Sequence, residues 1–278
     1  MHSSETDLEK KESALRDLLR DCGSVVIGYS GGVDSVYLAK SALDALGSER
    51  VLAVTGRSPS YPDVQYRTAL EVAGDLGLPH IEIHTGETDD PNYTANPFNR
   101  CYFCKTDLYS RLVALARARG FATVLDGSNA DDLDDYRPGL AAARELGVRS
   151  PLQEADLTKE EIRSLSRRAG LPTWDMPASP CLASRIPYGI EVTPHRLHQI
   201  EVAEARLREL ASWGPFRVRH HGEWARLELC PDDLRRFSDN PQLRSRVTRV
   251  LKESGFARAC VDLEGYRRGA LNEALAPR

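Results

Sequence analysis

Three cysteines stand in two short segments whose residue types suit metal binding or nucleophilic chemistry. They lie in Cys101-Tyr102-Phe103-Cys104-Lys105 and in Pro180-Cys181-Leu182-Ala183-Ser184-Arg185. A CxxC pair is typical of a redox pair, of half a zinc site or of part of an iron–sulfur site. Three cysteines that leave one coordination position open suit a 4Fe-4S cluster whose fourth iron takes an external ligand. The alternative is three unrelated buried thiols.

The positions of the cysteines disfavour two of these readings. Cys101 and Cys104 do not open a βαβ unit, as a thioredoxin-type pair does. No histidine lies at zinc-finger spacing to complete a closed zinc site. The other three cysteines, Cys22, Cys230 and Cys260, stand among apolar residues in or beside expected helices and strands. We therefore expect these three to be either core residues or chemically inert.

A glycine-rich turn follows the apolar run at 25–27, and residues 28–35 read Gly-Tyr-Ser-Gly-Gly-Val-Asp-Ser. Glycines let successive backbone N–H groups point inward, and the amino end of the following helix adds partial positive charge. This predicts an anion cradle for a phosphate, or, as the alternative, an ordinary strand-to-helix turn. The expected binding residues are Ser30, Gly31, Gly32, Asp34 and Ser35. Asp34 suits a metal ligand or a cap for the loop amides.

A second polar stretch, Leu125-Asp126-Gly127-Ser128-Asn129-Ala130-Asp131-Asp132, follows a later apolar run. Open parallel sheets bind ligands at the carboxyl ends of their strands. Carboxylates beside a triphosphate suit Mg²⁺, which takes one or two protein oxygens. We expect nucleotide contacts from Gly127, Ser128, Asn129 and Asp131. Asp132 is either a magnesium ligand or a helix cap.

Arg217 and Arg219 alternate on an expected strand, so both side chains point to one face. Two guanidinium groups on one face can clamp a phosphate monoester, such as that of a mononucleotide. The alternative is the solvated polar face of an edge strand.

The elements that must position these residues alternate along the first part of the chain. Short β-branched runs at 25–27, 51–54, 81–83 and 124–125 are typical of buried strands. Helical patterns occupy 5–20, 35–46, 67–76, 106–119 and 159–169, the last opened by a capping-box spacing of Thr158 and Glu161. Strands separated by helices predict an α/β fold: a parallel sheet with helices on both faces.

Residues 172–194 contain five of the sixteen prolines, which excludes a helix or a central strand there. A helix at 195–211, strands at 216–221 and 225–230, helices at 231–237 and 240–254 and a strand at 259–263 follow. This order predicts a smaller α+β domain. The expected domains are therefore 1–178 and 179–278.

Composition agrees with this organisation. The 278 residues include 37 Lys and Arg against 41 Asp and Glu, a net charge of −4, with 41% apolar residues. These values disfavour a disordered chain and a protein that holds a long nucleic acid by charge. No window approaches about 18 uninterrupted apolar residues and the amino end has no apolar signal region. We expect a cytoplasmic protein with no membrane contact, in which thiols stay reduced.

The run Ser30-Gly31-Gly32-Val33-Asp34-Ser35 after a strand resembles the PP-loop of the adenine-nucleotide α-hydrolase-like superfamily, the ATP pyrophosphatases, a Rossmann-like fold. The resemblance implies cleavage of ATP between its α- and β-phosphates, adenylation of a substrate oxygen, and pyrophosphate held by the loop with Mg²⁺. Arg137-Pro138-Gly139 continues the similarity, and there Arg137 would order the nucleotide region. The alternative for Arg137 is a plain surface arginine.

Together with the cysteine segments, Asp126 to Asn129, and residues 174–178 and 180–189, the PP-loop is similar to the LarE family. LarE proteins are ATP-dependent sulfur transferases in the biosynthesis of the nickel-pincer nucleotide cofactor of lactate racemase. The resemblance implies that a carboxylate of pyridinium-3,5-biscarboxylic acid mononucleotide is adenylated and converted to a thiocarboxylate. It also implies a phosphate site at Arg217 and Arg219.

The same resemblance implies roles for further residues. Ser184 and Arg185 would orient the substrate or adenylate beside Cys181. Acidic residues in the region of Glu201, Glu204 and Glu228 would hold a divalent metal. Family members assemble as hexamers, so a homo-oligomer is expected; the sulfur donor is left open.

Family members divide at the cysteines. Some have only the residue matching Cys181, which gives up its own sulfur and becomes dehydroalanine. Others add the CxxC and bind a 4Fe-4S cluster whose free iron carries the sulfide. This chain has all three cysteines, so we expect the cluster-dependent form. The alternatives are sacrificial use of Cys181, a PP-loop tRNA thiolation enzyme, and a non-catalytic nucleotide-binding regulator.

Overall fold

The computed structural model describes residues 5–133, 137–267 and 270. The chain divides into two compact units. The first contains Met1–Glu87 and Cys101–Ser179, and the second contains Thr88–Arg100 and Pro180–Arg278. The second unit therefore begins next to the expected boundary at 178/179. It also includes Thr88–Arg100, a segment that the sequence pattern assigned to the first domain.

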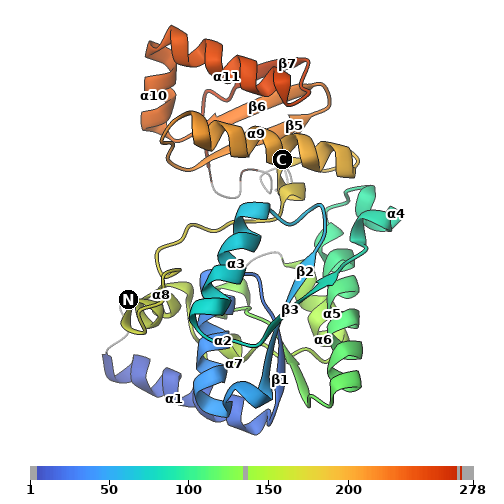
Figure 1. The fold of residues 1–278 in the computed structure, drawn as a ribbon, viewed down its shortest axis with the longest axis vertical. Helices are drawn as coiled ribbons and strands as arrows, with labels where there is room; N and C mark the ends of the chain where they lie inside the picture. The colour runs from blue at the N-terminus through green and yellow to red at the C-terminus, as the bar shows by residue number, and fades with distance from the viewer. Residues whose placement is uncertain (1–4, 134–136, 268–269, 271–278) are drawn as a thin grey trace. The chain divides into compact units, whose positions relative to one another are not determined.

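The first unit is built on a four-stranded parallel sheet with the order β3-β2-β1-β4 (Figure 1). The strands are β1 (Val25–Gly28), β2 (Val51–Arg57), β3 (His80–His84) and β4 (Thr123–Leu125). β1 lies between β2 and β4, and the chain after β1 leads to β2 on one side, whereas the chain after β4 leads to Arg149 on the other side. The loops after β1 and β4 meet at this switch point, where open sheets bind ligands.

Helices cover both faces of this sheet, as Figure 1 shows. The helices are α1 (Glu5–Asp21), α2 (Val33–Leu46), α3 (Asp63–Asp75), α5 (Arg100–Arg119), α6 (Pro138–Glu145), α7 (Pro151–Glu154) and α8 (Lys159–Arg168). Val25 and Ile27 face a core that α1, α2, α3, α7 and α8 complete. Val26 faces the opposite core, with α5 and α6. Because β1 is buried on both faces, its sequence is continuously apolar.

The predicted α/β fold is thus confirmed, with differences at the element ends. α2 begins two residues earlier than the periodicity indicated, and α5 begins at Arg100 instead of 106. α6 and α7 were not predicted, because helices of 8 and 4 residues are too short to show a clear helical period in the sequence. The capping box of α8 is present: the Thr158 hydroxyl accepts from Glu161 N, and the Glu161 carboxylate accepts from Thr158 N.

The second unit contains a three-stranded sheet with the order β5-β6-β7. Its elements are α4 (Pro91–Thr94), α9 (Pro194–Leu210), β5 (Phe216–His221), β6 (Trp224–Leu229), α10 (Pro231–Asp239), α11 (Pro241–Glu253) and β7 (Arg258–Val261). β5 and β6 are antiparallel, whereas β7 joins β6 in parallel. Apolar residues of β5 and β6 pack with α9 and α11. This is the small α+β unit that the sequence predicted.

Within the described ranges, none of the helices has the length and apolar character needed to span a membrane.

Candidate functional site

The glycine-rich loop after β1 requires glycine at position 31. Gly31 has φ +65°, and a Cβ placed on it would lie 2.7 Å from the Ala69 Cβ in α3. Both the backbone conformation and this close approach therefore exclude a larger side chain. The Ser30 carbonyl accepts hydrogen bonds from Tyr61 Oη at 2.9 Å and Gln65 Nε2 at 2.8 Å. These contacts fix the loop against the segment that follows β2.

The Ser35 side chain links backbone groups of the glycine-rich loop. Its hydroxyl accepts from Ser30 N at 3.2 Å and donates to the Gly32 carbonyl at 3.1 Å. Gly32 is the N-cap of α2 and supplies no side-chain hydrogen bond. The amino end of a 14-residue helix thus presents N–H groups and partial positive charge without a capping side chain. This arrangement is suited to a phosphate group.

The loop after β4 packs directly on the glycine-rich loop. A Cβ on Gly127 would lie 3.1 Å from Ser35 N, so glycine allows the two backbones to approach. Asn129 Nδ2 lies 3.4 Å from Asp34 Oδ1. The structure therefore brings together the two segments that the sequence singled out, at the switch point of the sheet.

Asp126 organises the second loop, a role that its sequence position alone did not reveal. Its buried carboxylate accepts from Tyr109 Oη at 2.7 Å and from the Ser150 hydroxyl at 2.7 Å. Ser128 adds hydrogen bonds from both its N–H and its hydroxyl. Lys105 lies over the Tyr109 ring, 5.1 Å from its centroid. The only sequence signal was an acidic residue directly after an apolar strand, which does not specify its hydrogen-bond partners.

The three other acidic residues of these loops are engaged by cationic or backbone partners. Asp34 forms an ion pair with Lys159, and the Asp131 carboxylate accepts from Lys159 N at 2.9 Å. Asp132 accepts from Asn129 N at 3.0 Å and pairs with Arg137 at 2.9 Å. Burial raises the pKa of Asp132. Asp132 thus caps a turn of its own loop, and its prediction as a magnesium ligand stays a prediction.

Lys159 is a member of this site that sequence reasoning missed. It is the first residue of α8, directly after the capping-box residue Thr158. Its ammonium group brings a positive charge to the glycine-rich loop, which itself contains no lysine. The only sequence signal was its place at the start of a well-capped helix, which does not specify what the side chain reaches.

The cysteines are divided between the two units. Cys101 and Cys104 lie in the first turns of α5, and their spacing puts them on one helix face. Cys101 is exposed, and Cys104 is half-buried. Cys181 is half-buried in the second unit and is the N-cap of η4 (Leu182–Arg185). No disulfide joins any of the six cysteines, all of which are described.

The remaining three cysteines fit the expectation of packed thiols only in part. Cys22 is buried, and burial raises its pKa. The Cys230 thiol donates to Asp233 Oδ2 at 3.1 Å. Cys260 is exposed on β7, so it is not a core residue, and its prediction as an inert thiol stays a prediction. Its apolar neighbours in the sequence suggested burial. However, β7 is an edge strand whose side chains are covered less than those of β6.

Arg185 and Arg219 form two buried ion pairs with Glu204 and Glu228, here called the arginine–glutamate cluster. Arg185 and both glutamates are 1% exposed, and Arg219 is 6% exposed. Arg185 Nε lies 3.1 Å from Glu204 Oε1, and Arg219 Nε lies 2.9 Å from Glu228 Oε2. Arg208 and Arg226 add contacts of 3.0 Å to Glu204 and Glu228, respectively. The buried charges are therefore compensated in pairs.

This cluster shapes the turn that carries Cys181. Arg185 Nη1 donates to the carbonyl of Cys181 and to the Ser184 hydroxyl, both at 3.1 Å. Arg219 Nη1 donates to the Ser184 carbonyl at 2.7 Å. Glu204 Oε1 also accepts from Val218 N, on edge strand β5, at 3.1 Å. The cluster thus joins α9, the Cys181 turn and β5.

Glu204 is ionised in this setting. Burial by itself would raise its pKa, but Arg185, assisted by Arg217 and Arg208, holds the pKa below its ordinary value. Arg217 projects from the same face of β5 as Arg219, as the alternation predicted. Burial, and then the neighbouring Arg185, lower the pKa of Arg217. A phosphate beside Arg217 would offset this concentration of positive charge.

No group of three or more His, Cys, Asp or Glu side chains is arranged to hold a metal ion anywhere in the described part of the chain. Mg²⁺ needs only one or two protein oxygens when phosphates and water supply the others. Asp34 and Asp132 lie beside the anion cradle but are engaged by Lys159 and by Asn129 and Arg137, so their assignment to Mg²⁺ stays a prediction. Glu204 and Glu228 are occupied by arginines, and their assignment to a divalent metal stays a prediction.

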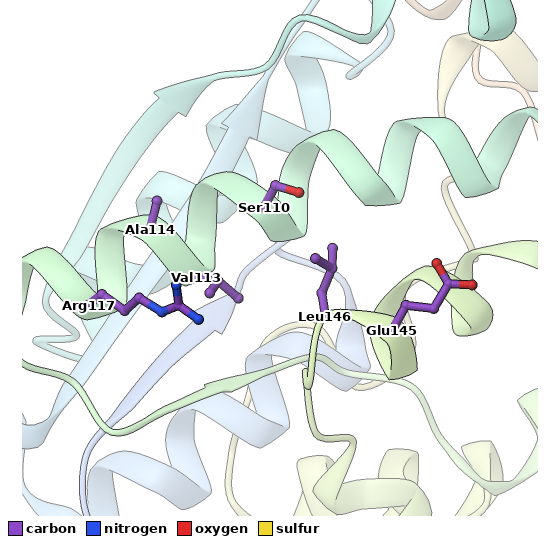
Figure 2. A pocket seen from close by; sticks show the side chains of 6 residues that line it. All are labelled: Ser110, Val113, Ala114, Arg117, Glu145 and Leu146. Atoms are coloured by element: carbon purple, nitrogen blue, oxygen red, sulfur yellow. The ribbon is translucent and has the colours of Figure 1, made fainter.

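A hollow on the first unit lies between α5 and α6, and none of the residues predicted to act lines it (Figure 2). It is lined by Ser110, Val113, Ala114, Arg117, Glu145 and Leu146.

Comparison with known proteins agrees with the geometry of the first unit. Residues 8–120 match the NAD synthase family, and part of the chain is 41% identical over 64 residues to a glutamine-dependent NAD(+) synthetase of Synechocystis sp.. That match covers 22% of this chain and 12% of the synthetase.

Two relatives match over nearly their whole length. An uncharacterised protein of Synechocystis sp. is 45% identical over 268 residues, which are 96% of this chain and 99% of that protein. The pyridinium-3,5-bisthiocarboxylic acid mononucleotide synthase of Lactiplantibacillus plantarum is 38% identical over 268 residues, 96% of each chain. With the glycine-rich loop and the parallel sheet, this similarity shows that the chain belongs to the LarE family of PP-loop, ATP-using enzymes.

Proposed function

We propose that the chain is an ATP-dependent sulfurtransferase that converts a carboxylate of pyridinium-3,5-biscarboxylic acid mononucleotide into a thiocarboxylate. The observation that carries the proposal is the anion cradle formed by Gly31, Gly32 and the loop after β4, in a chain similar throughout to the mononucleotide synthase. The product would serve the nickel-pincer nucleotide cofactor of lactate racemase.

The first step is adenylation. A carboxylate oxygen of the substrate attacks the α-phosphorus of ATP, the bond to the β-phosphate oxygen breaks, and pyrophosphate leaves. This step makes a poor electrophile reactive, because AMP is a good leaving group. Ser30, Gly31, Gly32 and Ser35 would hold the pyrophosphate, with Lys159 as an additional cation. Asp34 and Asp132 would hold Mg²⁺ against the phosphates, with Asn129 beside them.

The second step replaces AMP by sulfur. A hydrosulfide-level nucleophile attacks the acyl carbon, the bond to AMP breaks, and a thiocarboxylate and a proton result. Cys101, Cys104 and Cys181 would hold a 4Fe-4S cluster, which would supply sulfur at this oxidation level. In the sacrificial alternative the Cys181 thiolate attacks to form a thioester. Loss of the Cα proton and cleavage of the Cβ–S bond then release the thiocarboxylate and leave dehydroalanine.

Three observations support cluster ligation by Cys101, Cys104 and Cys181. Cys101 and Cys104 share one face at the amino end of α5. Within the second unit, Asn96 Nδ2 donates to the carbonyls of Pro187 and Ile190, both at 2.8 Å, which fixes the segment that follows the Cys181 turn. The Cys181 turn is fixed in turn by Arg185. Thiolates are the ligands that such clusters use.

Arg217 and Arg219 would receive the phosphate of the mononucleotide substrate. Both lie on one face of β5, and Arg217 is near enough to Arg185 for the second guanidinium to lower its pKa. An anion is the natural partner of such a group. Ser184 and Arg185 would hold Cys181 toward the adenylate. We also propose a homo-oligomer and an external sulfur donor, in line with the family.

An anaerobic assay with ATP and the bis-carboxylated mononucleotide tests this function. We expect AMP and pyrophosphate to appear in equal amounts only when the mononucleotide is present, together with a product whose carboxylate oxygen is replaced by sulfur. The masses of product and protein are recorded in the same reaction. Unchanged protein after several turnovers supports the cluster route.

Two results would redirect or refute the proposal. Protein lighter by one H₂S after a single turnover would establish the sacrificial route. Absence of mononucleotide-dependent AMP release would overturn the proposed function. The Cys181→Ala variant is the matched control, because it should release pyrophosphate and form the acyl-adenylate, from which AMP leaves only by hydrolysis, without forming a sulfur-containing product by either route.

A further inference from the structure

The three-stranded sheet of the second unit has two edges that differ in how their backbone groups are engaged. At the β5 edge, Val218 N donates to the buried carboxylate of Glu204 at 3.1 Å. At the β7 edge, Ala259 and Val261 have no hydrogen bond on the side away from β6 among the described residues. Unpaired N–H and C=O groups at a sheet edge are a template for pairing with another strand.

The hydrogen bonds of β7 show which of its backbone groups face away from β6. Arg258 N and Asp262 N donate to carbonyls in or next to β6, at 3.2 and 2.9 Å, respectively. Backbone N–H groups alternate in direction along an extended strand, so Cys260 shares this inward orientation. Ala259 and Val261 therefore present their N–H and C=O groups at the open edge.

The order of residues along this edge suits an antiparallel copy of the same strand. A two-fold axis beside Cys260 would place Ala259 opposite Val261 of the second copy, and such a pair can exchange two hydrogen bonds. The same axis would place Arg258 opposite Asp262, which joins opposite charges at both ends of the ladder. Cys260 would then lie opposite Cys260 of the second copy, in a pair without hydrogen bonds.

The surroundings of the open edge include exposed apolar side chains. Trp224, which is in register with Arg258, is 40% exposed, and Leu263, directly after the strand, is 87% exposed. The Arg258 guanidinium carbon lies 5.2 Å from the Trp224 ring centroid, and Asp262 Oδ2 lies 3.4 Å from Arg226 Nε. These contacts hold the two charged side chains beside the strand. Apolar surface rimmed by charged groups is typical of a protein–protein interface.

We infer that two copies of this chain pair through β7, antiparallel and in register about Cys260, so that the sheets of the two second units form one continuous sheet. The occupant of the edge is a second copy because Arg258 and Asp262, equally spaced from Cys260, make the edge complementary to itself. The inference rests on the homo-oligomer of the proposed function and is independent of its chemistry.

Oxidative cross-linking tests the register without altering the fold. In an antiparallel pair without hydrogen bonds the two Cα atoms are about 4.5 Å apart, which is within the range of a disulfide. Diamide takes two electrons and two protons from the two thiols and is itself reduced to the hydrazine. We expect a covalent dimer on a non-reducing gel for the wild type and none for Cys260→Ser. The control is Cys101→Ser, which removes the other exposed thiol and should leave the dimer unchanged.

Two variants of Val261 test the backbone hydrogen bonds of the edge. Val261→Pro removes an N–H that makes no bond within the chain, and with it two of the expected bonds between copies. Val261→Thr is the matched control, because it keeps the N–H and the β-branched shape. In sedimentation experiments we expect the dissociation constant of self-association to rise roughly tenfold or more for Val261→Pro and to change little for Val261→Thr.

Charge reversal tests the pairing of Arg258 with Asp262. Arg258→Asp and Asp262→Arg each place like charges opposite one another, so either variant alone should associate weakly. An equimolar mixture of the two should associate as the wild type does, because each variant supplies the charge that the other lacks. Circular dichroism confirms that each variant is folded. This comparison decides the inference even if Val261→Pro does not fold.

Three outcomes overturn the inference. Wild-type protein that sediments as a monomer also refutes the homo-oligomer, but leaves the proposed reaction intact. An oligomer that forms no Cys260 disulfide and is unchanged in Val261→Pro shows that the copies meet at another surface. Equal weakening in Val261→Pro and Val261→Thr, or no recovery in the mixture of charge variants, shows that this edge does not carry the association. None of these measurements uses ATP or the mononucleotide, so the assay of AMP release tests the proposed reaction separately.

Discussion

The glycine-rich loop of the first unit and the arginine–glutamate cluster of the second concentrate positive charge in different ways. The loop uses backbone N–H groups, and its glycines are required by close contacts such as that of Gly31 with Ala69. The cluster uses buried side chains, with Arg185 and Glu204 each 1% exposed. The loop is made by six neighbouring residues, whereas the cluster joins residues 185, 204, 219 and 228.

This difference predicts different consequences of mutation. A loop whose backbone N–H groups point at a ligand contributes little to the free energy of unfolding, because those groups make their hydrogen bonds only when the ligand is bound. Removing one partner of a buried ion pair lowers the stability of the fold, because the other charge is then buried without compensation. We therefore expect changes in the loop to affect activity most and changes in the cluster to affect stability most.

The largest expected effect is that of Glu204→Ala. Its removal leaves Arg185 and Arg208 without their shared carboxylate and Val218 N without its acceptor. We expect the free energy of unfolding to fall by about 3–5 kcal/mol. Urea denaturation followed by circular dichroism measures this change.

The control for Glu204→Ala is Glu253→Ala in the same unit, which removes an exposed ion pair with Arg206. Exposed pairs contribute about 1 kcal/mol or less. Equal effects of the two substitutions would contradict the view that the cluster is a stability device.

His220 extends the comparison to the opposite face of β5. Its Nε2 lies 3.0 Å from Gln199 Oε1, and its ring packs near Phe256. Burial, and then Arg196, lower the pKa of His220 to about 4. The unfolded chain takes up the proton near pH 6.5 while the folded chain does not, so stability is full above pH 6.5 and is lost as the pH falls toward 4.

We expect this loss to reach about 3 kcal/mol at most, from a pKa difference of roughly two units. Urea midpoints of the wild type and His220→Gln between pH 7 and pH 4.5 measure it. The stability of His220→Gln should depend less steeply on pH. Parallel pH profiles of the two proteins would show that the pKa of His220 is the same in the folded chain as in the unfolded chain.

Gly31→Ala tests the first region. The new Cβ would meet Ala69 at 2.7 Å and would have to adopt φ +65°. We expect the loop to shift and substrate-dependent AMP release to fall about 100-fold, because a displacement of about 1 Å in a binding loop has effects of that size. AMP is measured by chromatography.

Gly77→Ala is the matched control for Gly31→Ala. Gly77 has φ +60° but no heavy atom within 4 Å of a Cβ placed on it, so it carries the conformational strain without the clash. AMP release at the wild-type rate in Gly31→Ala, or an equal loss in both variants, would argue against the anion cradle.

The smallest effect is expected for Lys159→Met. The substitution removes the cation beside Asp34, and we expect the KM for ATP to rise about tenfold because one attraction to the triphosphate is lost. Stability should change by less than about 1 kcal/mol, since both side chains of the pair are partly exposed. Lys40→Met removes the comparable pair with Asp44 on α2 and should leave the KM unchanged. An unchanged KM in Lys159→Met would show that Lys159 does not contribute to ATP binding, which would then rest on the loops after β1 and β4 alone.

The same contrast explains how much of the site could be predicted. The glycine-rich loop and the loop after β4 each follow a short apolar strand, so a few adjacent residues specify both their conformation and their chemistry. Lys159 and Asp126 were missed, because nothing near them in sequence indicates what they contact. Arg217 and Arg219 were correctly expected on one face of β5, whereas the burial of Arg219 against Glu228 was not predicted.

The sequence by itself determined the parallel sheet, the capping box of α8, the glycine-rich turn and the α+β character of the second unit, because each rests on periodicity or on local backbone geometry. Only the tertiary structure decided that Thr88–Arg100 joins the second unit, that Cys260 is exposed, and that the charges of Arg185 and Glu204 are buried together. These features depend on contacts between residues far apart in the chain, where burial and charge pairing are settled by packing and not by neighbours in sequence.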